Sequence, residues 1–595
     1  MVSFLKPAEH SRQTLTMFWG VQILNFLTIS THWFLTTSSL EFYSILKLYI
    51  FSASLPILLL HFSKNLLQIT LLIVIILCYF AYIPLLPSFK FIYYICIILI
   101  LIINYKSIFQ FSIHHFHKYH YAIGLLILTY NICTNWFSNF NYLQLLYSGW
   151  IHDDTLFLSS LCAMYKTYNV ISLGIDGLIP TVYHSFALKV YAGISIVSGL
   201  SVIQVMSMFH PVTAATVIFL SIGYTIKSFH DKFNSKIFIQ YLLLYFITYQ
   251  FFIFRTVNTT YDFFWSQSMF IGTFLFLMII ILMNEYTKSR QNKNLLIVLI
   301  YSIILTQTKS NIAFFNIALV SLYVLMNFKN NKFIIIYYLI FLLINAIFLD
   351  QIISVNLSRT NPSFTFADSI IKYESLMPRF NIHDRLIRII FYSIVFYSPY
   401  LTYLIILKRT NQKLITNNIL NIIIHLTCFV SVLFNYFFTI GFEMFYFIGP
   451  SLFFSIIGIT SITSVNSKIF NFLPIILVLV CTYSILDMWR MGNKANRQNY
   501  IYNKLVFDNN EVSQKLIQKL ITIKPSRNNI IKYNIKDIPI NNFPEHQIKF
   551  LIPTITECVT VGQKIPKGVF WGGDPYKNPN DRKLPKSPKI INISD

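Results

Sequence analysis

Long runs of apolar residues separated by short polar turns recur along the chain from Met17 to about Asp487. Each run approaches the roughly 20 residues that an α-helix needs to cross a bilayer. The runs do not alternate apolar with polar residues, so they predict helices rather than the strands of a membrane barrel. We predict about 15 such helices, centred on 17–36, 43–61, 66–84, 90–104, 120–136, 208–228, 236–254, 268–284, 293–307, 311–328, 333–350, 386–408, 417–437, 441–463 and 468–487.

The composition supports the same fold class. A chain that is 55% hydrophobic and only 11% charged is too apolar for a soluble domain of 595 residues. No small-residue cleavage pattern follows the first run, so we expect that run to be retained as a helix. The seven cysteines form no CxxC pair and are typical of small core residues. The predicted fold is an all-α polytopic membrane bundle of about 13–15 helices.

The distribution of basic residues predicts the orientation in the membrane. The net charge of +24 is scattered over short turns, including those near Lys64, Lys106 and Lys288, whereas alternate turns keep few cations. Because Lys and Arg favour the cytoplasmic side, the N-terminus is expected inside and the C-terminus outside. Scattered charge of this kind argues against a nucleic-acid partner. The usage of Ile, Asn, Lys and Phe favours a bacterial origin, and hence the inner (plasma) membrane.

This topology divides the chain into four expected parts. They are N-terminal transmembrane helices, an extracytoplasmic acidic loop with surface helices, a transmembrane core with an outer loop at 351–385, and an extracytoplasmic C-terminal tail. Within the tail we expect a small domain over roughly 500–560 and then a flexible, Gly- and Pro-rich end. The boundaries of the four parts are 1–136, 137–207, 208–487 and 488–595.

The acidic loop contains the most unusual local pattern, Gly149-Trp-Ile-His-Asp-Asp-Thr-Leu-Phe157. Apolar residues then recur at helical spacing as far as Tyr168, with Ser159, Ser160 and Lys166 between them. This pattern predicts an amphipathic helix that begins at the two aspartates and lies on the bilayer. After a turn over 174–180, we expect further surface helices from Tyr183 to Met208, and Pro211 opening the next span.

Two interpretations of the aspartates compete. An aspartate before an apolar run is a common helix N-cap, which contributes about 1 kcal/mol. Capping explains one carboxylate of Asp153 and Asp154, but not the second. Adjacent like charges raise a carboxyl pKa, and this favours proton transfer. His152, Asp176 and His184 could act with the pair, or could be ordinary surface and turn residues.

The run HDDTLFLSSLCAMYKTYNVISLGIDGLIPTVYHSFALKVYAGIS resembles the first extracytoplasmic loop of the GT-C superfamily of integral-membrane glycosyltransferases. In that pattern an acidic pair opens a surface helix, a turn with Gly and Pro follows, and an aromatic residue, here Tyr183, begins a second helix. The run also resembles uncharacterised bacterial membrane proteins of surface-polysaccharide assembly. In many GT-C members the loop follows the first span, whereas about five predicted spans precede it here.

The resemblance implies transfer of a sugar from a polyprenyl-phosphate carrier to a saccharide or glycolipid acceptor outside the cytoplasm. Asp153 or Asp154 would accept the proton of the attacking hydroxyl. A cation would offset the charge on the departing phosphate, and Lys309, between two spans, is the first candidate. The alternatives for this role are Arg255 and the cluster containing His383 and Arg385.

A divalent ion, Mg²⁺ or Mn²⁺, is an optional addition between Asp153 and Asp154, with His152 as a further ligand. Two other functions stay open. A polysaccharide polymerase or a transporter or flippase of lipid-linked saccharides would also use many spans. A non-enzymatic scaffold would give the acidic pair no special role.

Overall fold

The computed structural model describes a large part of the chain, and the chain folds into two compact units. The described residues are 12–36, 42–61, 66–109, 153–181, 185–230, 267–327, 332–357, 419–437, 451, 454, 511–533, 545–561, 583–585 and 588–593. The first unit combines Met1–His115, Leu125–Thr216 and Met488–Asp595, and the second combines Phe116–Gly124 and Val217–Asp487. The N-terminal helices, the acidic segment and the C-terminal segment therefore belong to one unit.

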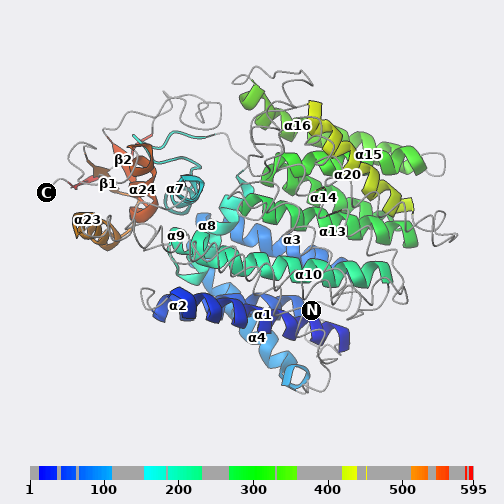
Figure 1. Ribbon diagram of the computed structural model, residues 1–595, viewed down its shortest axis with the longest axis horizontal. Coiled ribbons are helices and arrows are strands. Elements are labelled where there is room, and N and C mark those ends of the chain that lie inside the picture. The colour runs from blue at the N-terminus through cyan, green and yellow to red at the C-terminus, as the bar shows by residue number, and fades with distance from the viewer. Residues whose placement is uncertain are drawn as a thin grey trace, which may run out of the picture. The chain divides into compact units, whose positions relative to one another are not determined.

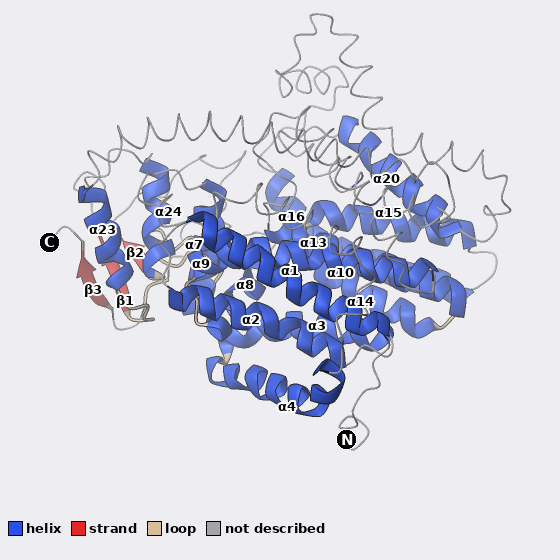
Figure 2. Ribbon diagram, turned by 60° about the horizontal axis from the view of Figure 1, so that its bottom comes forward, coloured by secondary structure: helices blue, strands red, loops and turns tan. Residues whose placement is uncertain are grey.

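Four apolar helices begin the first unit, and they follow the predicted runs closely. Their bounds are α1 Arg12–Thr36, α2 Phe42–His61, α3 Leu66–Tyr82 and α4 Lys90–Phe109, with the short turns η2 Ile83–Leu85 and η3 Pro87–Phe89 between the last two (Figures 1 and 2). Helices α1 and α2 are joined by side-chain amides, because Gln22 donates to the carbonyl oxygen of Ala53 at 2.8 Å. Such polar contacts hold apolar helices together where lipid weakens the hydrophobic effect.

The acidic segment forms helix α7, Asp153–Tyr168, followed by α8, Phe186–Ser198. After Gly199, a residue in the left-handed conformation, the chain turns sharply, and the axes of α8 and the next helix differ by 112°. That next helix is continuous through α9 Val202–Gln204, the π-turn η5 Val205–Phe209 and α10 His210–His230. The segment expected to form surface helices therefore consists of two helices that meet at a sharp bend.

Pro211 does not open this helix, contrary to the sequence-based expectation. The helix begins at Ser201, whose side chain accepts the N–H of Gln204 while the Gln204 side chain accepts the N–H of Ser201. This reciprocal pair satisfies two backbone donors that a helix start would otherwise leave unbonded. The π-turn directly before Pro211 bonds His210 N–H to the Val205 carbonyl. Such a wide turn is one way a helix continues past a proline, which has no N–H of its own.

The second unit contains a buried helix that packs against a helical hairpin. Its described helices are α13 Gln267–Ser289, α14 Asn292–Thr308, α15 Ser310–Asn327, α16 Lys332–Leu357 and α20 Ile419–Phe437. Helix α13 is buried over almost its whole length and packs closely on α14 and α15. The Asn316 amide on α15 donates to the Ser302 hydroxyl on α14 at 2.8 Å. This contact pairs the two arms of the α14–α15 hairpin.

The C-terminal segment contains a small parallel sheet, which the sequence patterns did not predict. Its elements are α23 Glu511–Thr522, β1 Asn529–Lys532, α24 Glu545–Thr556, β2 Val559–Val561 and β3 Lys589–Asn592. The strand order is β2-β1-β3, and both pairings of β1 are parallel. Helix α24 makes the crossover between β1 and β2 that parallel strands require. The expected flexible end is also wrong in part, because Ile590 of β3 pairs with Ile530 of β1.

Four of the described helices are long and apolar enough to cross a membrane, or up to five if the bent pair α8–α9 counts as one span. Together with the high helix content, these helices define a mostly helical, membrane-embedded protein. The total of about 13–15 spans stays a prediction, because several expected runs lie wholly or almost wholly outside the described residues, namely 120–136, 236–254, 386–408, 441–463 and 468–487.

Candidate functional site

Helix α7, which starts with the acidic pair, is enclosed by protein rather than lying on a surface. Every residue from Leu156 to Tyr165 is buried, including Ser159 and Ser160. The surrounding elements are α8, α24, η2, α9 and η5. The prediction of an amphipathic surface helix is therefore wrong. The burial of Ser160 is compensated by a hydrogen bond, because its hydroxyl donates to the carbonyl oxygen of Leu173 at 2.5 Å.

Asp153 and Asp154 are the first two residues of α7, and their side chains lie outside the described part of the structure. The next turn is fixed by α24. The Thr554 hydroxyl donates to the Leu156 carbonyl oxygen at 3.0 Å, and the Phe157 ring meets the Phe550 ring edge-on, with 5.9 Å between centroids. The start of the acidic helix is thus positioned by residues from the C-terminal segment.

The turn expected after α7 is a small hairpin whose two sides pair between Ser172 and Pro180. Asp176 lies at its tip with a left-handed backbone, φ 53, between Gly174 and Gly177, which also have positive φ. Aspartate tolerates this conformation better than most residues, so a turn role accounts for its presence here. Its side chain is partly buried.

The tip of this hairpin binds the edge of the C-terminal sheet. Thr560 of β2 donates its N–H to the Gly174 carbonyl oxygen at 2.7 Å, and its own carbonyl accepts the Gly177 N–H at 2.9 Å. These bonds satisfy backbone groups on the side of β2 away from β1. The hairpin after α7 therefore bonds to the β2 edge of the sheet, and these bonds are among the contacts between the two segments of this unit.

A second junction joins the end of α7 to the same sheet. The Tyr168 hydroxyl donates to the Asn529 carbonyl oxygen of β1 at 3.0 Å and accepts the Val559 N–H of β2 at 3.1 Å. Burial raises the pKa of this phenol, and nearby Cys558 adds to the rise. Tyr168 therefore stays a neutral structural donor at physiological pH and is unsuited to act as an acid or base there.

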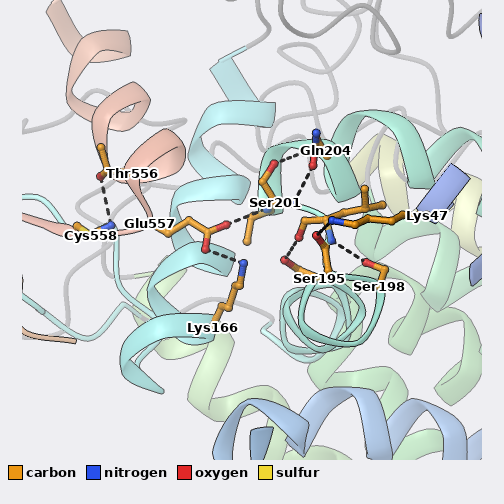
Figure 3. A network of polar contacts seen from close by, with 12 residues as sticks. Lys47, Lys166, Ser195, Ser198, Ser201, Gln204, Thr556, Glu557 and Cys558 are labelled. Carbon is orange, nitrogen blue, oxygen red and sulfur yellow. Dashed lines mark hydrogen bonds and ion pairs between the residues drawn. The ribbon is translucent and has the colours of Figure 1, made fainter. Parts of the chain in front are cut away.

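A buried ion pair lies between the same segments. The Lys166 ammonium on α7 is 2.6 Å from the carboxylate of Glu557, whose side chain is 2% exposed. The other carboxylate oxygen accepts the N–H of Val202, the first residue of α9, at 2.9 Å. Figure 3 shows the carboxylate between Lys166 and the start of α9. A carboxylate near a helix N-terminus also interacts favourably with the helix dipole.

At the α8 side of the bend, the charged group is a lysine and not a carboxylate. The Lys47 ammonium on α2 donates to the carbonyl oxygen of Gly199, which follows α8, at 3.0 Å (Figure 3). Between the two ends, the Ser195 hydroxyl donates to the Leu200 carbonyl oxygen, and the Gln204 amide donates to the Ser44 hydroxyl. The bend thus has a cation at the carbonyl end of one helix and an anion at the N–H end of the next, as helix dipoles favour.

Lys309 lies in the second unit, between α14 and α15, and its side chain is buried, with 6% exposed. It is the one residue between the two helices and has an extended backbone. Gly272 of α13 faces it, and a Cβ at that position would lie 3.2 Å from the Lys309 Cβ. A buried ionisable residue at a break between apolar helices is costly, which keeps Lys309 a candidate for function.

The remaining predicted site residues stay predictions. They lie outside the described residues and are His152, Tyr183, His184, Arg255, His383 and Arg385. Within the described ranges, no three His, Cys, Asp or Glu residues are grouped as metal ligands. The optional Mg²⁺ or Mn²⁺ ion therefore stays a prediction that depends on the aspartate side chains.

Sequence reasoning missed Glu557 and Thr554. Neither residue belongs to a local motif, and each meets α7 only through the tertiary fold. The sequence signal for the bend, in contrast, was present, because Ser201-Val-Ile-Gln204 is a capping-box pattern. Neither the models of known protein families nor the curated proteins give a match to this chain.

Proposed function

We propose that this chain is a GT-C-type membrane glycosyltransferase. It would move a sugar from a polyprenyl-phosphate-linked donor to a saccharide or glycolipid acceptor in the synthesis of a surface polysaccharide or glycolipid. The reaction would occur on the extracytoplasmic face of a bacterial inner membrane, with the N-terminus in the cytoplasm. A divalent ion, Mg²⁺ or Mn²⁺, between Asp153 and Asp154 stays an optional part of this proposal.

The observation that carries the proposal is the position of two adjacent aspartates at the start of a helix that the protein encloses. One carboxylate suffices to cap a helix. The helix that follows Asp153 and Asp154 is held by α24 through Thr554 and by the C-terminal sheet through Tyr168. A base must be held within hydrogen-bond reach of the proton that it removes. A rigidly packed helix start meets that requirement better than a mobile loop.

The chemistry follows from the groups involved. The acceptor hydroxyl oxygen attacks C1 of the donor sugar, and its proton passes to Asp153 or Asp154. The bond between C1 and the phosphate oxygen breaks, and polyprenyl phosphate leaves with the electron pair. A cation near the phosphate offsets the charge that develops there. Lys309 is our first candidate for that cation, because it is a buried lysine between two apolar helices.

The direct test replaces the two aspartates by asparagine, singly and together. Membranes with the full-length protein would be supplied with a panel of radiolabelled polyprenyl-phosphate hexoses, and labelled lipid and polysaccharide products would be measured. We expect the double variant to lose about 100-fold or more in transfer rate at unchanged protein level. Glu285→Gln is the matched control, since Glu285 on α13 is only partly buried. Normal transfer by the double variant would refute the assignment.

A second candidate function is transport of a lipid-linked saccharide. The bent pair α8–α9, with its 112° change of direction, supports it, because transporters place substrate at interrupted helices. The ends at this bend, however, already bond to the protein's own Lys47 and Glu557. Export of a fluorescent polyprenyl-phosphate sugar from proteoliposomes, with no sugar transfer, would favour this second candidate.

A further inference from the structure

Glu557 occupies a backbone position that normally suits a smaller residue. It follows α24 directly and has φ 51, in the left-handed region. Helices often end with such a residue, usually glycine, because a Cβ makes this conformation less favourable. A residue other than glycine adopts this conformation when contacts with the surrounding structure hold it there. The contacts of the Glu557 side chain therefore hold its backbone in this conformation.

Those contacts join three helices. Glu557 follows α24, its carboxylate forms an ion pair with Lys166 of α7 at 2.6 Å, and it accepts the Val202 N–H of α9 at 2.9 Å (Figure 3). A buried carboxylate is costly to desolvate unless its oxygens are paired. Both of its oxygens are used, each by a different helix. The side chain thus fixes the end of α7 relative to the start of α9.

The same part of the chain also fixes the beginning of α7. One turn before Glu557, the Thr554 hydroxyl bonds to the Leu156 carbonyl oxygen, and Phe550 packs against Phe157. Helix α7 is therefore held near both ends by α24 and the residue that follows it. A rigid helix held at two points has a defined axial position and rotation. These in turn determine where its first two residues lie.

We propose that Glu557 is a positioning residue for the acidic pair. Through Lys166 and Val202 it sets the position of α7, and so of Asp153 and Asp154, relative to the bent helices α8 and α9. The inference rests on the proposed function, since it assumes that the pair acts as the base. A displacement of about 1 Å at a reacting group can cost about 100-fold in rate. Loss of the Glu557 contacts should therefore reduce kcat without unfolding the protein.

The sharpest test is the double variant Glu557→Gly/Lys166→Met in the full-length protein. Glycine suits the left-handed backbone, and methionine fills the lysine volume without an unpaired charge. Because the variant leaves the Val202 N–H without its acceptor, folding is checked before kcat is measured. The panel of radiolabelled polyprenyl-phosphate hexoses serves as substrate. We expect kcat per folded protein to fall about tenfold or more while the donor KM stays within about twofold. Glu285→Gln on α13 is the control and should retain the wild-type kcat.

Glu557→Asp is a second variant that keeps the charge but shortens the side chain by one methylene group. It should fold normally and lower kcat about threefold or more. If the double variant does not fold, Glu557→Asp alone tests whether Glu557 positions the acidic pair. A wild-type kcat per folded protein in either folded variant would show that Glu557 only stabilises the C-terminal segment. The inference would then fall, and the proposed function would stand.

Hydrogen exchange separates failure of this inference from failure of the proposed function. If the wild-type protein transfers sugar from no donor in the panel, the proposed function fails, and backbone exchange over 153–160 still tests the positioning. In the double variant, exchange there should be about tenfold faster, with α13 unchanged. Unchanged exchange over 153–160 would overturn the positioning role independently of activity.

Discussion

Gly193 of α8 lies directly against the backbone of Phe80 on α3, so that a Cβ at position 193 would overlap the Phe80 carbonyl oxygen. The obstacle is backbone and cannot rotate away, so one of the two helices would have to move. We predict that Gly193→Ala destabilises the full-length protein by about 1–3 kcal/mol or more. A lower thermal midpoint in detergent is the measurement.

Gly272→Ala is the matched control for that change. Its new Cβ would lie 3.2 Å from the Lys309 Cβ, a tight contact but not an overlap. Alanine also improves helix propensity by roughly 1 kcal/mol. Its midpoint should stay close to that of the wild type. If the two alanine variants have the same thermal midpoint, close packing of α8 on α3 does not account for the effect of Gly193→Ala.

The predicted topology can be tested by cysteine labelling in intact cells. Thr155→Cys, next to the acidic pair, should react with a membrane-impermeant maleimide added outside, in a background in which Cys96 is replaced. Ser289→Cys, exposed at the end of α13, should react only after the cells are opened. Labelling of position 155 only after opening would place the acidic pair in the cytoplasm and exclude extracytoplasmic transfer.

Lys309→Met should reduce sugar transfer while the fold is retained. Methionine keeps most of the length of the side chain but removes the charge that would face the departing phosphate. We expect about a 100-fold loss in transfer rate, the size found when one stabilising donor is removed. Lys293→Met is the control, because Lys293 is exposed at the start of α14. Equal rates in both variants would remove Lys309 from the site.

The buried thiols should resist alkylation in the folded protein. Burial raises the pKa of Cys558, and also that of Cys162, above the ordinary value. Since the thiolate is the reactive form, a raised pKa means less reaction at a given pH. Iodoacetamide at pH 8.5 should modify both residues only after unfolding, as measured by mass spectrometry.

The same raised pKa fixes the sign of a stability effect. Above the ordinary thiol pKa the unfolded chain releases protons that the folded chain retains, so this contribution to stability declines as the pH rises. Fast labelling of Cys558 in the folded protein at pH 8.5 would contradict its buried position.

The membrane helices were predictable because their signal is local. The expected run 311–328 corresponds to α15, Ser310–Asn327, and the run 43–61 to α2, Phe42–His61. Length and apolar composition are enough to define such elements. Pro211 is a typical first residue of a helix, but this helix begins earlier, at the capping box of Ser201 and Gln204.

The surroundings of the acidic pair were not predictable in the same way. Helical spacing of apolar residues is equally compatible with a membrane surface and with a second helix. Only the packing of Thr554 and Phe550 on α7 decides between them. The partner of Lys166 lies far along the chain, and no local pattern marks Glu557 as that partner. Contacts of this kind depend on the whole fold.

The pairing of β3 with β1 constrains the order of biosynthesis. Lys589–Asn592 are made after every membrane helix of the chain, yet they complete the sheet to which the hairpin after α7 is bonded. During synthesis, α7 is therefore made before its neighbours in the C-terminal segment, α24 and the sheet. The acidic helix therefore reaches its full set of described neighbours only once Lys589–Asn592 have joined the sheet.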